Sequence, residues 1–123
     1  MNTKLIILGC GNSMGVPRID GYWGKCNKKN KKNTRSRCSA IIQKGSNSIL
    51  IDTAPDIRDQ FIANKIKNLS SVIYTHEHAD QTNGLFELRP FTFSKNRINA
   101  SFLGKPTNYR NKINIYGNRQ TIS

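Results

Sequence analysis

The sequence is poor in cysteine, in acidic residues and in long hydrophobic runs. Its three cysteines are an odd number with no Cys-x-x-Cys pair, which argues against a disulfide framework and against a cysteine-rich zinc knuckle. The apolar run near the N-terminus, residues 5–8, falls short of the roughly 7 to 15 residues of a signal-peptide core. No run approaches the ~20 apolar residues of a membrane span. We therefore expect a cytoplasmic protein that does not associate with a membrane.

Acidic residues number seven against 20 Lys and Arg, which gives a formal net charge of +13. Residues 18–37 hold eight Lys and Arg against one Asp, and residues 90–123 hold six with no acid. Such clusters neutralise phosphates, which favours binding to nucleic acid or another polyanion. The abundance of Lys, Asn and Ile is also typical of AT-rich coding, and a charge run is often a solvated loop. Both interpretations remain open.

The 123 residues suffice for one domain, and short apolar runs mark its expected strands. A long loop over residues 10–37 is rich in Gly, Asn and Lys. A turn of four residues, 45–48, is expected to join the second strand to the third. The expected strands cover residues 4–9, 39–44, 49–52, 71–74 and 113–116.

Helical spacing of apolar residues predicts a helix after the third strand, with Thr53 as its cap and with Pro55 and Asp56 in its first turn. Its apolar positions are Ile57, Phe61, Ile62 and Ile66. A second, short helix is expected over residues 83–89, and residues 90–112 are expected to be irregular or weakly stranded. This order of strands and helices predicts an α/β layer in which loops at strand ends hold the functional site.

Both histidines of the chain follow the predicted strand 71–74, two residues apart, and Asp80 comes two residues later. Alternate residues that leave a strand can point to one side. His76, His78 and Asp80 would then present two imidazoles and a carboxylate, which suit zinc, manganese or iron. The same spacing also fits two surface histidines beside a helix-capping Asp. The local pattern leaves both interpretations open.

Several motifs, in this order along the chain, resemble the metallo-β-lactamase-fold hydrolases. They are LGCGNSMGVP, WGKC, NTRSRCS, LIDTAPDIRDQ and VIYTHEHADQTNGLFELRP. The resemblance is to the phosphoribosyl cyclic phosphodiesterase branch in particular, and more distantly to the tRNA 3′-processing endonucleases. It implies an αββα sandwich that holds two metal ions, zinc or manganese, at one edge of its sheets, and a metal-dependent phosphodiester hydrolase.

The family's metal motif is His-x-His-x-Asp-His. The resemblance implies that His76 and His78 bind the first metal and that Asp80 binds the second and acts as general base on a metal-bound water. Gln81 stands where the family has His, and an amide oxygen is a weaker ligand for such metals than an imidazole. Asp52 matches the Asp of the family's first motif, which supports the metal loop from behind.

The family also has ligands that this sequence lacks. Its later half supplies a third His, a bridging Asp and a final His, whereas no His follows His78 here. Catalytic zinc normally takes three protein ligands for each ion. We therefore expect residues 1–123 to be one truncated domain, the N-terminal half of the αββα sandwich, impaired or inactive alone. Its partner would be a separately encoded C-terminal half or a second copy of the chain.

Two further interpretations of the basic segments stay open. Arg35 and Arg37 are candidates to bind a substrate phosphate through bidentate hydrogen bonds, or they are solvated loop residues. A non-catalytic basic remnant would bind nucleic acid through residues 18–37 and 90–123. A decayed split-gene product is the remaining alternative to a working hydrolase.

Overall fold

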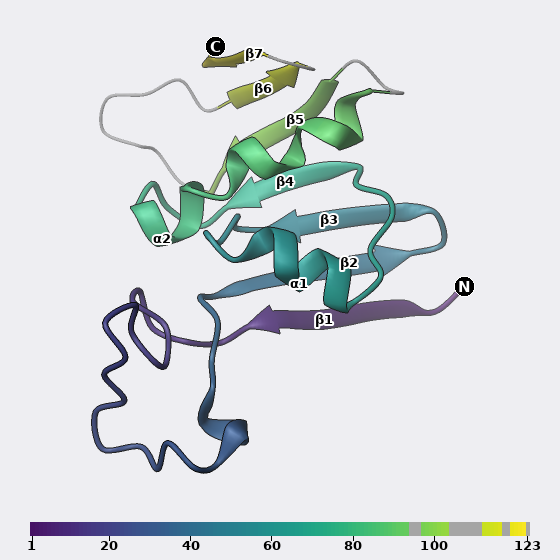
Figure 1. The fold of residues 1–123 in the computed structure, drawn as a ribbon. Coiled ribbons are helices and arrows are strands. Elements are labelled where there is room, and N and C mark those ends of the chain that lie inside the picture. Colours follow the sequence, from purple (N-terminus) through teal and green to yellow (C-terminus); the bar gives the residue numbers. More distant parts are fainter. Residues whose placement is uncertain (94–96, 104–111, 117–118, 123) are drawn as a thin grey trace.

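The computed structural model describes residues 1–93, 97–103, 112–116 and 119–122 (Figure 1). These residues form one seven-stranded sheet whose strands lie in chain order. The α/β class predicted from the sequence is confirmed. The strands are β1 (Thr3–Gly9), β2 (Ser39–Lys44), β3 (Asn47–Ile51), β4 (Ser71–Tyr74), β5 (Arg97–Phe102), β6 (Lys112–Tyr116) and β7 (Arg119–Ile122).

The helices are short and lie on one face of the sheet (Figure 1). They are the α-helices α1 (Ile57–Ala63) and α2 (Ala79–Thr82) and the 3-10 helix η2 (Leu85–Thr92), while a further 3-10 turn, η1 (Lys31–Asn33), lies in the loop after β1. Among the described residues, no helix is long and apolar enough to cross a membrane.

Strand directions bring several loops to one edge of the sheet. Strands β1, β2 and β3 are antiparallel neighbours, whereas β3, β4 and β5 are parallel. Strand β1 therefore runs in the same direction as β3, β4 and β5. The loops that follow β1, β3 and β4 all leave from the same edge, on the left of Figure 1.

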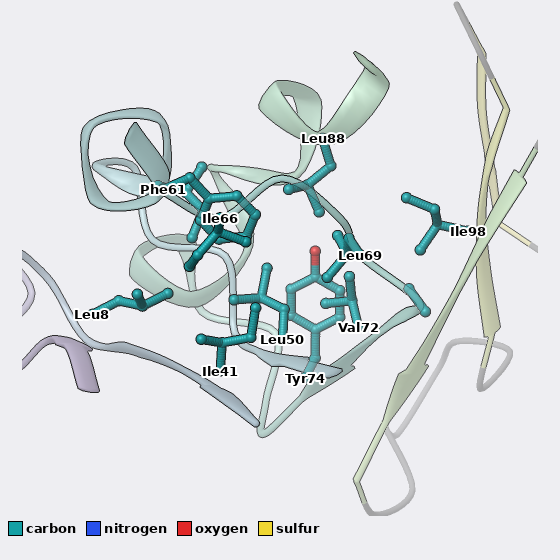
Figure 2. Packing of buried hydrophobic residues seen from close by; sticks show 12 residues of the cluster. Leu8, Ile41, Leu50, Phe61, Ile66, Leu69, Val72, Tyr74, Leu88 and Ile98 are labelled. Carbon is teal, nitrogen blue, oxygen red and sulfur yellow. The ribbon is translucent and has the colours of Figure 1, made fainter. Parts of the chain in front are cut away.

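The covered face of the sheet packs against α1 and η2. Side chains from alternate strand positions point into the space between the sheet and these helices, as Figure 2 shows. Burial of apolar surface here is the main stabilising contribution to the fold. The buried cluster consists of Leu8, Ile41, Leu50, Ile57, Phe61, Ile66, Leu69, Val72, Tyr74, Leu88, Ile98 and Ala100.

The opposite face of the same strands is also apolar, and we call it the open face. In register, Leu5 pairs with Ile42 and Ile42 with Ile49, which gives one apolar row across three strands. Leu5 is 62% exposed. A second row consists of Ile7, Ala40, Ile51 and Ile73. Among the described residues, no helix covers these two rows (Figure 1).

Two predictions about the first half of the chain are wrong. The turn between β2 and β3 has two residues rather than four, because Lys44 pairs with Asn47 and Gly45 takes a φ of 58°. Thr53 does not cap α1, since Asp56 holds the N-cap position. Ile62 lies within α1, as predicted, and its side chain is 61% exposed.

Other differences concern the second half. The helix expected over residues 83–89 is replaced by α2 and η2. Residues 90–112 contain β5, and parts of that segment, 94–96 and 104–111, lie outside the described residues. The strand predicted at 113–116 is β6, and it is followed by β7, which the sequence analysis did not anticipate.

Candidate metal site

The two histidines lie in the loop between β4 and α2, at the edge where the parallel strands end. His76 and His78 are both exposed, and their ring centroids are 4.5 Å apart at an interplanar angle of 76°. His78 is the N-cap residue of α2. The strand end therefore brings the two imidazoles together on one side of the loop, as alternate spacing predicts.

A chain of hydrogen bonds supports His76 from behind. The Thr75 backbone N–H donates to Asp52 Oδ1 at 2.8 Å, and the Thr75 hydroxyl donates to Asp52 Oδ2 at 2.7 Å. Thr75 Oγ1 also lies 2.9 Å from His76 Nδ1. Because the single hydroxyl proton goes to the carboxylate, the oxygen accepts from His76, whose proton is therefore assigned to Nδ1. This tautomer leaves the Nε2 lone pair of His76 available to a metal ion.

Asp52 follows β3 directly, with a φ of 60° that few non-glycine residues adopt. Its backbone N–H donates to the Ile73 carbonyl at 2.9 Å, so both its backbone and its carboxylate connect β3 to the end of β4. Asp52 supports the histidine loop, as the resemblance implies, but it does so through Thr75. Thr75 was not among the predicted site residues, although a hydroxyl residue between the strand and the first His was a visible signal.

Asp80 and Gln81 occupy the first turn of α2. Gln81 Nε2 donates to Asp80 Oδ2 at 2.9 Å. The Gln81 side chain is buried, and its Oε1 has no hydrogen-bond partner among the described residues. The amide at this position thus orients the Asp80 carboxylate by donating a hydrogen bond, and it leaves one buried acceptor oxygen unsatisfied.

Thr53 fixes α2 against the loop that follows β3. Its backbone N–H and its hydroxyl both lie within hydrogen-bond distance of the Gln81 carbonyl, at 2.7 and 3.0 Å. Its hydroxyl is also 2.9 Å from the Tyr74 hydroxyl. Burial raises the pKa of Tyr74 well above its usual range, so this phenol stays neutral. Thr53 is buried because each of its polar groups finds a partner here, which explains why it does not serve as a helix cap.

The two arginines that were equal candidates for phosphate binding differ in the structure. Arg37 forms a bidentate pair with Asp56, with Nε–Oδ2 and Nη2–Oδ1 distances of 2.7 and 2.8 Å. These hydrogen bonds lower the pKa of Asp56 and raise that of Arg37, and the charge of Asp80 raises the pKa of Arg37 further. Arg35 is exposed, and its Nη1 lies 3.3 Å from the Thr34 carbonyl. Arg37 is therefore engaged in the fold through Asp56.

The segment around Arg37 is fixed from two sides. Gln60 Nε2 donates to Ser36 Oγ and to the Arg37 carbonyl, both at 2.9 Å, so α1 holds residues 36–37 in place. At the end of β1, a Cβ on Gly9 would collide with the Arg37 carbonyl oxygen, so glycine is required for this approach. The loop after β1 and the start of α1 thus meet at the edge of the sheet where β1, β3 and β4 end, which is also where the loop with His76 and His78 lies.

The donor set fits part of a metal site. Two imidazoles and a carboxylate are ligands that zinc, manganese and iron accept, and the supported tautomer of His76 suits such an ion. Within the part of the chain that the structure describes, however, no three His, Cys, Asp or Glu side chains gather closely enough to hold a metal. The described residues bring two imidazole rings together, and no third ligand that would complete a metal site is found among them.

Comparisons with known proteins agree with an α/β layer that carries a histidine loop at its edge. Residues 47–110 match the model of a beta-lactamase superfamily domain, so the chain belongs to this superfamily. A diphosphatase from the PhnP family is 37% identical, with a TM-score of 0.69 over 76% of this chain and 37% of that one. The described fold is thus part of the metallo-β-lactamase fold.

Two other relatives are informative in different ways. Zinc-bound PqqB from Methylobacterium extorquens shares the fold, with 22% identity and a TM-score of 0.58 over 72% of this chain and 34% of that one. An octanoyltransferase from Porphyromonas gingivalis is 39% identical over 87 residues, which are 70% of this chain and 18% of that protein. The chain spans well under half of the length of each of these relatives.

Proposed function

We propose that this chain supplies one half of a metal-dependent hydrolase site for phosphate esters, with phosphodiesters as the expected substrates. The observation that carries the proposal is the Asp52–Thr75–His76 chain, which leaves the His76 Nε2 lone pair free on a ring whose centroid is 4.5 Å from that of His78. Identity of 37% to a diphosphatase supports the choice of phosphate chemistry. The match to the octanoyltransferase covers 18% of that protein, which is too small a share to support that activity here.

Each residue has a distinct part in this proposal. His76 and His78 hold the metal ion, for which zinc or manganese is expected. A bound ion of this kind supplies Lewis acidity and lowers the pKa of water. Asp80 accepts the proton of the attacking water and contributes to a second ion site. Gln81 holds the Asp80 carboxylate by a hydrogen bond, and its amide makes that second site weaker than an imidazole would.

The rest of the site comes from chain beyond these 123 residues, on the same polypeptide or on a separate one. The open face supports this part of the proposal, since a second layer over Leu5 and Ile7 would bury side chains that are 62% and 61% exposed. Self-association through the same face is the alternative. The free thiols Cys10, Cys26 and Cys38 support the expected cytoplasmic location.

Hydrolysis of bis-p-nitrophenyl phosphate, with Mn²⁺ or Zn²⁺ added, tests the proposed function. We expect the chain alone to be inactive, because its described residues do not complete a metal site. A chimera in which this chain replaces the matched part of the PhnP-family diphosphatase should be active. In the chimera, His76→Ala should abolish turnover and Gln81→His should raise it, while Asn83→Ala, an exposed change next to α2, should leave turnover unchanged.

Two results would contradict the proposal in different ways. Metal-dependent turnover by the isolated chain, lost on His78→Ala, would show that these residues already form a complete site. A folded chimera without turnover would show that His76, His78 and Asp80 do not serve a hydrolase.

A further inference from the structure

The loop over residues 10–37 is a built structure on the same edge of the sheet as the candidate metal site (Figure 1). Val16 and Arg35 form an antiparallel bridge in which each backbone N–H donates to the other's carbonyl, at 2.9 and 2.8 Å. Further turns join Arg18 to Tyr22 and Cys26 to Trp23, with N–O distances of 3.0 and 3.1 Å. Backbone hydrogen bonds therefore order the loop, although it contains little regular secondary structure.

Within this loop lies a cavity of about 420 Å³, which we call the loop cavity. The residues that line it include Tyr22, Trp23 and Met14. Arg18 and Lys25 also line it. Its volume is in the range of about 300 to 1,000 Å³ that is common for small-molecule sites. The loop cavity thus combines flat apolar surfaces with positive charge.

Arg18 and Tyr22 are arranged before any ligand arrives. The Arg18 guanidinium lies 4.6 Å from the centroid of the Tyr22 ring, and Arg18 Nε donates to Asp20 Oδ1 at 2.9 Å. The hydrogen bonds from Arg18 lower the pKa of Asp20 to about 2, so this pair stays ionised at neutral pH. Trp23 is partly exposed beside them. Part of its indole is therefore accessible to a ligand.

We propose that the loop cavity binds a nucleotide, whose base stacks on Trp23 and whose phosphate is attracted by Lys25. Stacking platforms with adjacent cations are the common means of holding an unpaired base and its phosphate. Inorganic phosphate alone would make no use of Tyr22 and Trp23, and an apolar ligand would make no use of Lys25.

This inference rests on the proposed function in one respect: it names nucleotide phosphates as the substrate class of the neighbouring site. Binding itself needs no metal and no turnover, so it is measured separately. The nucleotide has two potential sources, a free mononucleotide and the end of a single strand. The chemistry recognised, a base with its phosphate, is the same in both.

Fluorescence offers a direct test, because Trp23 is the sole tryptophan of the chain. The full chain is titrated with adenosine monophosphate, with ribose 5-phosphate and with a short single-stranded oligoadenylate. We expect adenosine monophosphate to quench the fluorescence and ribose 5-phosphate to leave it nearly unchanged. If the oligoadenylate binds more tightly than adenosine monophosphate, with a steep dependence on salt, the ligand is the end of a single strand. If the two bind with comparable affinity, the ligand is a free mononucleotide. The inference is overturned if neither adenosine monophosphate nor the oligoadenylate quenches the fluorescence. It is also overturned if ribose 5-phosphate quenches as strongly as adenosine monophosphate.

Variants measured by calorimetry separate stacking from charge. Trp23→Ala should weaken nucleotide binding about tenfold, in line with the usual strength of one stacked base, while Trp23→Phe should retain most of it. The matched aromatic control is Phe93→Ala, at a residue that is 71% exposed and outside the loop. Lys25→Ala should weaken binding several-fold, whereas Lys44→Ala, at the far end of β2, should not.

The remaining outcomes are decisive for this inference alone. Unchanged affinity in Trp23→Ala, with a retained circular dichroism spectrum, shows that no base stacks there. Trp23 is not a member of the buried cluster, so this variant is expected to fold. Nucleotide binding that persists in His76→Ala would show that the loop cavity is distinct from the metal site. If the chimera had no hydrolase activity, nucleotide binding by the chain would still be expected, so the two proposals can fail separately.

Discussion

The two faces of the sheet carry similar side chains in different surroundings. On the covered face, Leu50 is completely buried beneath the helices. On the open face, Leu5 belongs to an equally apolar row and is 62% exposed. Neighbouring positions of β3 show the contrast most closely, since Leu50 points to the helices while Ile49 and Ile51 point to the other side.

This difference shows that both faces of the strands carry apolar side chains suited to burial, although the described residues cover one face. Strands that are apolar on both faces normally lie between two layers. The relatives agree, because this chain covers 37% of the PhnP-family diphosphatase. The site at the sheet edge is incomplete in the same way, with two close imidazoles and no third nearby ligand in the described residues.

The largest expected effect compares two leucines on opposite faces. Leu50→Ala should lower the free energy of unfolding by about 2 to 5 kcal/mol, because it leaves a cavity in a closely packed core. Leu5→Ala should cost less than about 1 kcal/mol, because that side chain is largely exposed in the folded chain. Urea unfolding of both variants measures the difference. Equal losses would mean that the open face is covered in solution.

Self-association tests whether the open face is available for contact. Ile7→Lys should weaken self-association about a hundredfold, because a lysine would be buried without a partner in the contact. Ile62→Lys is the matched control, since both isoleucines are 61% exposed and Ile62 lies on α1. Analytical ultracentrifugation gives both dissociation constants. A compact monomer at all concentrations, or equal effects of the two changes, would argue against this use of the open face.

The support of His76 offers a sharper comparison at the sheet edge. Thr75→Val removes the hydroxyl that joins Asp52 to His76 Nδ1 and should weaken zinc binding about tenfold. Thr75→Ser keeps the hydroxyl and should retain most of the affinity. Calorimetric titration with zinc measures both variants. If valine were tolerated as well as serine, the hydrogen-bond chain would have no part in metal binding.

The smallest expected effect concerns the ion pair between Arg37 and Asp56. The hydrogen bonds from Arg37 lower the pKa of Asp56 in the folded chain below its pKa in the unfolded chain. The ion pair therefore stabilises the fold fully at pH values above the unfolded pKa. This stabilisation is lost as the pH falls through the lower pKa of the folded chain. Asp56→Asn should cost about 1 kcal/mol at neutral pH and should flatten the decline in stability below about pH 4. Asp59→Asn, at an exposed carboxylate near Arg58, is the control. Urea unfolding at several pH values measures both, and an unchanged acid profile in Asp56→Asn would contradict this account.

The sequence predicted the first four strands well because their alternation is local. The apolar pattern of residues 39–44 and 71–74 reproduces β2 and β4, and the spacing of His76 and His78 predicted rings on one side of a loop. The helix cap was wrong because Thr53 bonds to Tyr74 and Gln81, which are distant in sequence. Local patterns contain no information on such partners.

Site details that depend on tertiary contacts also escaped the sequence. Arg35 and Arg37 were indistinguishable as loop arginines, and the pairing of Arg37 with Asp56, 19 residues away, separates them. Thr75 was overlooked because its role requires Asp52 beside it. Gln81 was identified through the family motif, whereas its hydrogen bond to Asp80 required the structure.

Zinc retention by the isolated chain tests the central claim most directly. The pure protein is loaded with zinc, dialysed against metal-free buffer and analysed for metal, next to His78→Ala and Thr75→Ser. The half-site account predicts weak binding of one ion that is lost on dialysis, and no detectable binding in His78→Ala. Stoichiometric zinc that remains after dialysis, or zinc binding unaffected by His78→Ala, would contradict it.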